Sequence, residues 1–403
     1  MNSFLYRHRV LSLLIVIIGI ALMVLAAWMI TAGPVTVARI VRYGDTDIDD
    51  FSHYPGRELV ASRTPYVFEV SDTPLNVSDA ALQHFPSGKD LETIVATHDS
   101  IAFLVIHDDT IAFERYFHGH TASSLSQAFS MSKSVFSALV GMAIEDGYLH
   151  GVDQPITDFV PELAARGFAA VTIRHLLTMT SGSNYVENDN PFGEHVIMNY
   201  TPALEAQILT VELEDTPGAR FRYKSGDNAL LALALNRSLS NESITAYMQR
   251  RVWTPLGMEH RGVWTIDHEG DGLEKTWCCL AASARDLAKI GGLFLNQGRW
   301  NGEQLVAAEW VAESAGRKQI PDSAWPADYR AAGWRGYGYQ WWLASEQDGD
   351  YFAFGKDGQF LYVNPRRGVI IVRLGWSSGG LSSSEWIGLF QTIAAEFQRQ
   401  SRD

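Results

Sequence analysis

The hydrophobic pattern of this chain begins with one long apolar run. From Val10 to Ala32 no residue is charged, and 23 residues in a helix cover the ~30 Å apolar core of a bilayer at ~1.5 Å per residue. Arg7 and Arg9 precede the run, and positive charge there favours a cytoplasmic N-terminus. No later stretch is apolar for long enough to span again. We therefore expect residues 1–33 to be a signal anchor with one transmembrane helix; a signal peptide cleaved near Ala32 is the alternative.

After this run, short apolar strands stand near both ends of the chain, with helical patterns between them. Residues 101–107 and 111–117 flank an acidic turn at Asp108 and Asp109, which predicts a β-hairpin. Further strands are predicted within 337–344, 359–365 and 368–376, and helices over 131–148, 227–239, 283–296 and 384–399. This order predicts an α+β sheet domain that carries an inserted helical lobe.

The stretch between the apolar run and the first strand has a different composition. Residues 34–90 mix Pro, Asp, Ser and Gly with short apolar runs, which predicts a stalk and lead-in. The expected organisation is therefore an anchor over 1–33, a stalk over 34–90 and one folded domain over 91–403. Hydrophobic residues make up 46% of the chain, which is enough for a sizeable core.

Charge and cysteine content exclude several classes of protein. The formal net charge is −14 and no basic block is present, so nucleic acid is not an expected partner. The two cysteines, Cys278 and Cys279, are adjacent and cannot build a disulfide framework. The twelve histidines form no His-Glu-x-x-His or other metal signature. We expect neither a metal nor another cofactor.

The first motif that could carry chemistry is Ser130-Met131-Ser132-Lys133, at the start of the helix after the hairpin. The spacing places Ser130 and Lys133 one turn apart on one helix face. A serine hydroxyl needs a neighbouring base, and a lysine can be that base if burial or nearby cations lower its pKa. The helix N-terminus adds a backbone N–H for an oxyanion. Taken alone, an exposed Ser and Lys on an ordinary helix is the alternative interpretation.

Two further motifs follow. In Tyr223-Lys224-Ser225, a tyrosine held as a phenolate by cations can shuttle a proton. In Lys356-Asp357-Gly358-Gln359, a cation and a backbone without a side chain lie before a strand, and the next N–H can complete an oxyanion hole. A surface turn and a glycine-rich hairpin turn are the alternatives. Three of the seven lysines fall in the three motifs, which strengthens their joint interpretation.

At these places the chain resembles the serine β-lactamase and penicillin-binding-protein family, and more narrowly the class C β-lactamase-like serine hydrolases. The order Ser-x-x-Lys, Tyr-x-Ser, Lys-x-Gly matches, as do the stretches 171–182 (VTIRHLLTMTSG) and 147–155 (GYLHGVDQP). The resemblance covers residues 90–400 and implies a β-lactamase/transpeptidase-like fold, with an antiparallel sheet flanked by helices. Met179 stands where many members have His. Asp357 stands where β-lactamases prefer Thr, which argues against β-lactam turnover because that position usually helps to bind the drug's carboxylate.

The resemblance also implies the catalytic roles. Ser130 would be the nucleophile and Lys133 its activating base. Tyr223 would pass the proton to the leaving group and later activate the deacylating water.

The same resemblance implies the surroundings of the reacting atoms. Lys356 would bias Tyr223 electrostatically, and the N–H groups of Ser130 and Gln359 would form the oxyanion hole. Ser225 and Gly358 would contact the substrate.

Other residues are weaker candidates for a substrate pocket. Asn184 and Tyr185, directly after the Thr-Ser-Gly stretch, are expected at its lip. An aromatic group with strand-like alternation is expected mainly in the core, with some rings lining an apolar pocket; its members are Trp334, Tyr337, Tyr339, Trp341 and Trp342.

One rival nucleophile is Ser377, in the Gly-x-Ser-x-Gly sequence over 375–379. An α/β-hydrolase triad needs a histidine after the serine, and the last histidine here is His268. We therefore expect Ser377 to lie in a turn between a strand and a helix.

Together these observations predict a serine hydrolase in the inner membrane, with its catalytic domain on the periplasmic side. Its expected substrate is a small molecule or peptide with an ester or linear amide bond, similar to 6-aminohexanoate dimer or a short carboxylic ester, cleaved through an acyl-enzyme on Ser130. A D-Ala-D-Ala carboxypeptidase or other cell-wall peptidase is one alternative. A catalytically silent receptor for cell-wall fragments is another.

Overall fold

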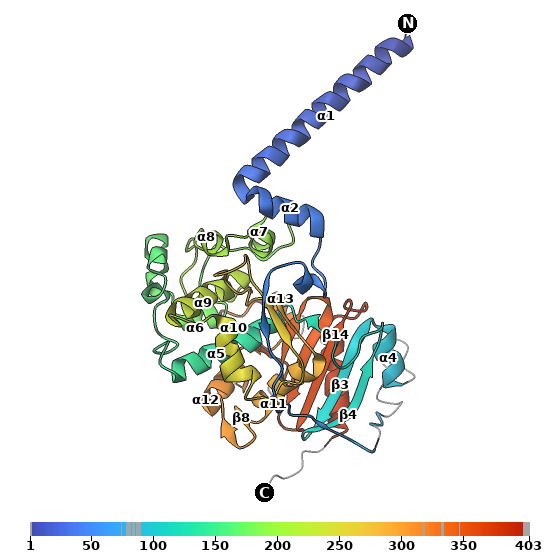
Figure 1. The fold of residues 1–403 in the computed structure, drawn as a ribbon, viewed down its shortest axis with the longest axis vertical. Coiled ribbons are helices and arrows are strands. Elements are labelled where there is room, and N and C mark those ends of the chain that lie inside the picture. Colours follow the sequence, from blue (N-terminus) through green and yellow to red (C-terminus); the bar gives the residue numbers. More distant parts are fainter. Residues whose placement is uncertain are drawn as a thin grey trace.

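The frame of the fold is an eight-stranded sheet in which strands from both ends of the folded chain meet (Figure 1). The computed structural model describes residues 2–73, 75–77, 82, 85, 90–316, 319–331, 334–345 and 347–397. The strand order is β10-β11-β12-β13-β14-β3-β4-β2, and every neighbouring pair is antiparallel except β2 with β4. These strands are β2 (Glu69–Val70), β3 (Ser100–His107), β4 (Thr110–Tyr116), β10 (Gly336–Tyr337), β11 (Trp342–Leu343), β12 (Tyr351–Gly355), β13 (Gln359–Asn364) and β14 (Val369–Gly375). The expected α+β sheet with strands from both ends is confirmed.

Helices cover both faces of this sheet. Phe103 and Val105 of β3 pack on one face with α4 and α14, whereas Leu104 and Ile106 pack on the other face with α5 and α11. Successive side chains of a strand point to opposite faces, so a strand covered on both sides is apolar at every position. The helices concerned are α4 (Leu91–Thr97), α5 (Met131–Glu145), α11 (Ala284–Leu295) and α14 (Ser383–Ala395).

The expected helical lobe comes between the two groups of strands in sequence and lies to one side of the sheet in space (Figure 1). Its helices are α6 (Ile173–Leu177), α7 (Glu194–Tyr200), α8 (Leu204–Ile208), α9 (Ser225–Ser238) and α10 (Ile244–Met248), with one-turn elements η2 (Ile156–Asp158), η3 (Pro161–Arg166), η4 (Phe168–Ala170) and η5 (Gln249–Trp253). A four-stranded sheet of order β1-β6-β7-β5 adjoins it: β1 (Gly56–Leu59), β5 (Ser126–Gln127), β6 (Gly262–Thr265) and β7 (Leu280–Ala282). Smaller elements are η1 (Asp50–Ser52), β8 (Arg299–Trp300), β9 (Glu303–Gln304), α12 (Ala308–Val311), η6 (Ala312–Gly316) and α13 (Ala327–Ala331).

The prediction of one continuous strand over 337–344 is wrong. The chain turns between β10 and β11, with Gln340 at φ 64° and Gly338 N–H donating to the Trp341 carbonyl. A Cβ on Gly338 would lie 1.9 Å from the Ser314 carbonyl oxygen, so the backbone approaches closely there. Alternating aromatic residues therefore mark a buried turn here. The strand β12, which no pattern indicated, pairs with β11 and β13.

One helix among the described residues is long and apolar enough to cross a membrane. It lies within α1 (Asn2–Ala32), from Tyr6 to Ala32, and none of its most apolar window is buried. In Figure 1 this helix projects away from the body, next to α2 (Pro34–Tyr43). A signal sequence near an N-terminus has the same length and composition, so the helix is a candidate for either.

The first part of the expected stalk is folded against the body. Thr36, Val37 and Ile40 of α2 are buried, and α2 packs on α7. The Arg39 guanidinium donates to the carbonyl oxygen of Tyr200 at 3.1 Å, and β1 pairs with β6. Residues 34–59 thus differ from a flexible stalk, because α2 packs against the helical lobe and β1 forms part of the smaller sheet. Part of the lead-in, residues 74, 78–81, 83–84 and 86–89, lies outside the described residues.

Candidate active site

The start of α5 brings the first motif together as expected. Lys133 Nζ donates to Ser130 Oγ at 2.9 Å and to the carbonyl oxygen of Trp277 at 2.9 Å. The amine is therefore fixed by two acceptors, one of them the serine that it would deprotonate. A base within hydrogen-bond distance of a hydroxyl is the geometry that activates a nucleophile.

The surroundings of Lys133 make it a base near neutral pH. Its side chain is 1% exposed, and burial lowers the pKa of Lys133 to about 8, although the carboxylate of Glu187 opposes part of this shift. Burial disfavours the charged ammonium because the protein interior solvates it less well than water does. The neutral fraction of Lys133, which can accept a proton, therefore reaches about half near pH 8.

Tyr223 lies beside this pair. The Lys133 Nζ is 4.8 Å from the centre of the Tyr223 ring, and the ring stacks on Trp342 at 5.5 Å. Burial raises the pKa of Tyr223 well above its ordinary value, Glu187 raises it further, and a hydrogen bond with Ser130 lowers it. The resting side chain is thus a neutral phenol, not the phenolate that the sequence suggested, and it can donate a proton.

The prediction that Lys356 biases Tyr223 is not supported by its contacts. Lys356 lies in the one-turn element η7 (Lys356–Gly358), and its Nζ donates to Asp45 Oδ1 at 2.6 Å and to the Thr46 carbonyl at 3.1 Å. A carboxylate attracts the ammonium more strongly than a neutral phenol does. The cation placed on the Tyr223 ring is Lys133 instead.

Gln359 and Gly358 also differ from their predicted roles. The Gln359 N–H, the expected oxyanion donor, donates to the Lys356 carbonyl at the end of η7, and the Gln359 side chain bonds the N–H and carbonyl of Gly375. Gly358 has φ 73°, and a Cβ there would lie 2.1 Å from the Arg373 guanidinium. A larger residue at this position would collide with the buried Arg373 side chain, which explains the glycine without a substrate contact. The oxyanion role of the Ser130 N–H remains a prediction.

Ser225 has a partner that the sequence did not indicate. Its Oγ and its N–H donate to the two carboxylate oxygens of Glu187, each at 2.6 Å. Glu187 also lies 3.5 Å from His195 Nδ1. The only sequence signal was an acidic residue two positions after Tyr185. Because Glu187 affects the pKa of both Lys133 and Tyr223, it belongs to the electrostatics of the site.

Asn184 and Tyr185 do not lie at the lip of the site, contrary to expectation. The Asn184 side chain accepts from the Glu212 N–H at 3.0 Å, which holds it against another loop. Tyr185 is buried beneath Gly226 and hydrogen-bonds His195 at 2.8 Å. Both residues support the loop that carries Glu187 and do not border the cavities at Ser130.

Two cavities meet at Ser130. The one that we call the aromatic pocket has a volume of about 310 Å³ and is lined by Tyr223, Tyr329, Trp334, Trp342 and Phe354. Two of the five aromatic residues singled out in the sequence thus line a pocket, while Tyr337, Tyr339 and Trp341 are buried core residues.

The other cavity, the acidic pocket, has a volume of about 680 Å³. Its carboxylates are Asp45, Asp50, Glu187 and Asp189, and Lys275 and Lys356 also line it. Cys278 and Cys279, which form a disulfide with each other, border it next to Trp277. The two adjacent cysteines are therefore disulfide-bonded to each other, but the bond does not link distant parts of the chain.

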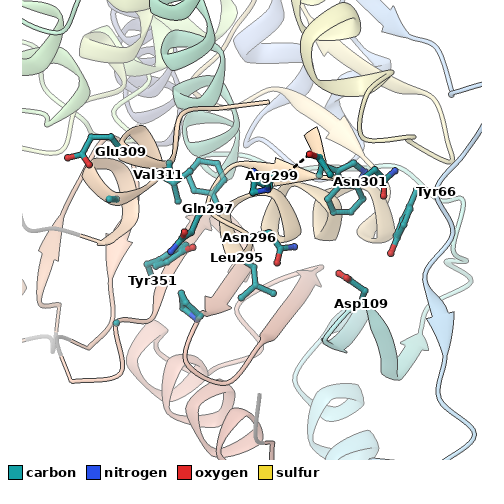
Figure 2. Close-up of a pocket in the computed structure, with 17 residues that line it drawn as sticks. Tyr66, Asp109, Leu295, Asn296, Gln297, Arg299, Asn301, Glu309, Val311 and Tyr351 are labelled. Carbon is teal, nitrogen blue, oxygen red and sulfur yellow. Dashed lines mark hydrogen bonds between the residues drawn. The ribbon is translucent and has the colours of Figure 1, made fainter. Parts of the chain in front are cut away.

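Neither the rival serine nor the larger cavity of Figure 2 belongs to this site. Ser377 lies in the turn between β14 and α14, where its Oγ donates to Asp99 at 2.6 Å. The cavity in Figure 2, about 880 Å³, lies around Asn296, Arg299 and Tyr351 and includes no residue of the three motifs. In the part of the chain that the structure describes, no three His, Cys, Asp or Glu side chains gather in a way that could hold a metal ion.

Comparisons with known proteins agree with this geometry. The Beta-lactamase family profile matches residues 91–382. A 6-aminohexanoate-dimer hydrolase of Paenarthrobacter ureafaciens is 26% identical over 325 residues, covering 77% of this chain and 81% of that protein. A solved Bacillus anthracis protein, named as a candidate 6-aminohexanoate-dimer hydrolase, has a TM-score of 0.70 at 20% identity, covering 86% of this chain and 93% of that one.

A second solved structure shares the fold. EstCE1, a hydrolase with promiscuous acyltransferase activity, has a TM-score of 0.61 at 16% identity, covering 79% of this chain and all of that one. The family profile spans most of the chain and includes the Ser-x-x-Lys, Tyr-x-Ser and Lys-x-Gly motifs. The chain therefore belongs to the β-lactamase family and is a serine hydrolase.

Proposed function

We propose that this enzyme hydrolyses short carboxylic esters or linear amides similar to 6-aminohexanoate dimer, through an acyl-enzyme on Ser130. The observation that carries the proposal is the 2.9 Å hydrogen bond between Ser130 and a buried Lys133 whose pKa is lowered to about 8. A neutral amine in that position accepts the hydroxyl proton as the oxygen attacks.

In the acylation step, Ser130 Oγ attacks the substrate carbonyl carbon and its proton passes to neutral Lys133. The carbonyl oxygen becomes an oxyanion near the N-terminus of α5, where backbone N–H groups stabilise negative charge. The bond to the alcohol or amine then breaks, and the leaving group takes the phenolic proton of Tyr223. Lys133, whose Nζ lies against the Tyr223 ring, returns a proton to the resulting phenolate.

In the deacylation step, water replaces the leaving group. Tyr223 takes a proton from this water while its own phenolic proton passes to neutral Lys133, and the water oxygen attacks the acyl carbon and forms a second oxyanion. Collapse of that oxyanion breaks the bond to Ser130 Oγ, which takes the proton back. The products are a carboxylic acid and the original enzyme, so the step needs no further reactant.

Two features favour ester or linear amide substrates over β-lactams. The aromatic pocket beside Ser130 offers apolar contact area to an acyl or alkyl chain. Lys356, a cation beside Ser130 that could attract a drug's carboxylate, is paired with Asp45. A named 6-aminohexanoate-dimer hydrolase is also among the relatives. Turnover of D-Ala-D-Ala peptides would support the peptidase alternative, and a protein inert toward all of these substrates would support the receptor.

A fluorophosphonate probe tests the proposal directly. We expect stoichiometric labelling of the purified protein, with the adduct mapped to Ser130 by peptide mass spectrometry, followed by turnover of p-nitrophenyl butyrate that exceeds turnover of nitrocefin. Labelling at Ser377, or nitrocefin turnover as efficient as that of the best ester, would contradict it.

We further propose that α1 anchors the enzyme in the inner membrane with the body on the periplasmic side. Its length, its lack of charge after Arg9 and the direct connection from Gly33 into α2 support this arrangement. An alkaline phosphatase fused to the C-terminus should be active, and a green fluorescent protein fused there should be dark. The reverse pattern would place the body in the cytoplasm.

A further inference from the structure

The chain between α2 and β1 crosses the active site. We call this segment, Gly44–Tyr54, the strap. At one end Asp45 and Thr46 bond Lys356; in the middle the Ile48 carbonyl accepts the Gln127 N–H at 2.9 Å, close to the start of α5. At the other end the Tyr54 ring lies under Lys275, with 4.2 Å from Nζ to the ring centre. Gly44, Asp45, Thr46, Asp50 and Tyr54 all line the acidic pocket, so the strap is one of its walls.

The first consequence concerns negatively charged substrates. Lys356 would attract a substrate carboxylate if its ammonium were unpaired, as the motif suggested. Asp45 already occupies it with a charge-assisted hydrogen bond of 2.6 Å. A carboxylate that entered the pocket would have to compete with Asp45, and would approach Glu187 and Asp189 as well.

The second consequence concerns positively charged substrates. Asp50 is 3% exposed; its Oδ1 lies 3.2 Å from His53 Nδ1, but its Oδ2 has no hydrogen-bond partner among the described residues. The Tyr54 hydroxyl next to it is also buried without a hydrogen-bond partner among those residues. A buried carboxylate oxygen without a donor is costly to the folded protein, because its lost hydration is not replaced. Both groups line the acidic pocket, so an entering donor could satisfy them.

The cations of the pocket do not cancel its carboxylates. Lys356 balances Asp45, and Lys275 donates to the Asn199 carbonyl at 2.6 Å while burial lowers its pKa to about 7. Burial also lowers the pKa of His195, which keeps that ring largely neutral at pH 7. Asp50, Glu187 and Asp189 then outnumber Lys275, which is itself only partly charged. The charges that line this pocket are therefore negative in sum, and the one further cation at Ser130 that the catalytic steps use is Lys133.

We propose that the acidic pocket is a subsite for an ammonium group of the substrate. Asp50 is the carboxylate that receives it, and Asp45 is the positioning residue that withholds Lys356 from anionic substrates. This inference rests on the proposed hydrolase function and narrows its substrates to esters or amides that carry an amine. The strap thus determines the charge of the substrate, while α5 and Tyr223 carry out the chemistry.

Calorimetry with small probes tests the subsite without turnover. The full-length protein in a neutral detergent is titrated with n-butylammonium, n-butanol and butyrate, which have nearly the same size and differ in charge. We expect butylammonium to bind at least about tenfold more tightly than the other two, a difference typical of one charge-assisted hydrogen bond. Equal affinities would overturn the proposal. Because binding is measured, a protein that hydrolysed no ester would still report on this subsite.

Two substitutions test the roles of Asp50 and Asp45 independently. Asp50→Asn should reduce the preference for butylammonium over butanol by about tenfold, and Asp45→Asn should strengthen butyrate binding several-fold because Lys356 is released. Glu58→Gln, an equal change of charge at an exposed residue of β1 outside the pocket lining, should change neither ratio. If Asp50→Asn does not fold, Asp189→Asn at the exposed rim should shift the ratio in the same direction. Ratios that move equally in the Glu58 variant would overturn the assignment.

Discussion

The two pockets at Ser130 border the same nucleophile but are built in different ways. The aromatic pocket is lined by rings from β11, β12 and the segment before β10, together with Tyr223, and its members stack on one another. The acidic pocket is assembled from segments distant in sequence: the strap, the loop with Glu187 and the stretch from Lys275 to Cys279. Most rings of the aromatic pocket thus come from one stretch of chain, 329–354, whereas the acidic pocket depends on several segments that are far apart in the sequence.

The largest effect should come from the proposed catalytic residues at Ser130, the point where the two pockets meet. Ser130→Ala, Lys133→Ala and Tyr223→Phe should each lower kcat/KM for p-nitrophenyl butyrate by roughly 10²–10⁴-fold, the range for removing an acid or base. Because the three act as a unit, a double variant should be little worse than Ser130→Ala. Ser377→Ala, a serine in a structural turn, is the control and should stay within a few-fold of the parent. Full activity of Ser130→Ala with loss in Ser377→Ala would invalidate the site.

The next prediction uses the pH dependence of kcat/KM to distinguish Lys133 from Lys275, which lines the acidic pocket. Because Lys133 must be neutral to accept the proton, kcat/KM should rise with pH by about tenfold per unit and level off above about pH 8. Lys275 has a pKa of about 7 but takes no part in the proposed steps. The pH profile of kcat/KM in the Lys275→Gln variant should therefore still level off near pH 8. If the profile of the parent instead levels off near pH 7, and the variant loses this pH dependence, the base is Lys275.

A smaller effect distinguishes the aromatic pocket from the acidic pocket. Trp334→Ala should lower kcat/KM for p-nitrophenyl butyrate about tenfold more than for the acetate, because two methylene groups lose their apolar contacts. Binding of butylammonium in the acidic pocket should not change. Trp376→Ala, at an exposed tryptophan outside both pockets, is the matched control. Equal losses for both esters would show that acyl chains do not enter the aromatic pocket.

The smallest effect is expected at the disulfide that borders the acidic pocket. Cys278 follows Trp277, whose carbonyl accepts from Lys133, so removing the bridge should displace that carbonyl slightly. A double Cys278→Ala and Cys279→Ala variant should lose less than about tenfold in kcat/KM, since the hydrogen bond to Ser130 remains. The ratio of butyrate to acetate turnover, set by the other pocket, should stay constant. A change in that ratio would show that the two pockets are coupled.

The sequence alone determined that Ser130 and Lys133 lie together, and it determined much of the fold. Ser130 and Lys133 are three residues apart in a helix, so helical geometry places them on one face whatever the rest of the chain does. The hairpin over β3 and β4 follows in the same way, because alternating apolar residues and an acidic turn are local signals. Tyr223 was found only through the resemblance of three ordered motifs, since its distance from Ser130 in sequence gives no geometry.

Only the tertiary structure decided the partners of those residues. The motif around Lys356 could not show that Asp45, 311 positions away, would take up its ammonium, nor that Glu187 would bind Ser225. The aromatic alternation over 337–344 predicted a strand, but close packing of Gly338 on Ser314 bends the chain there. The protonation of Tyr223 likewise depends on burial among rings from other strands. Local geometry follows from spacing along the chain, whereas charge pairing, burial and pKa depend on which distant segments meet, and packing of the whole chain determines that.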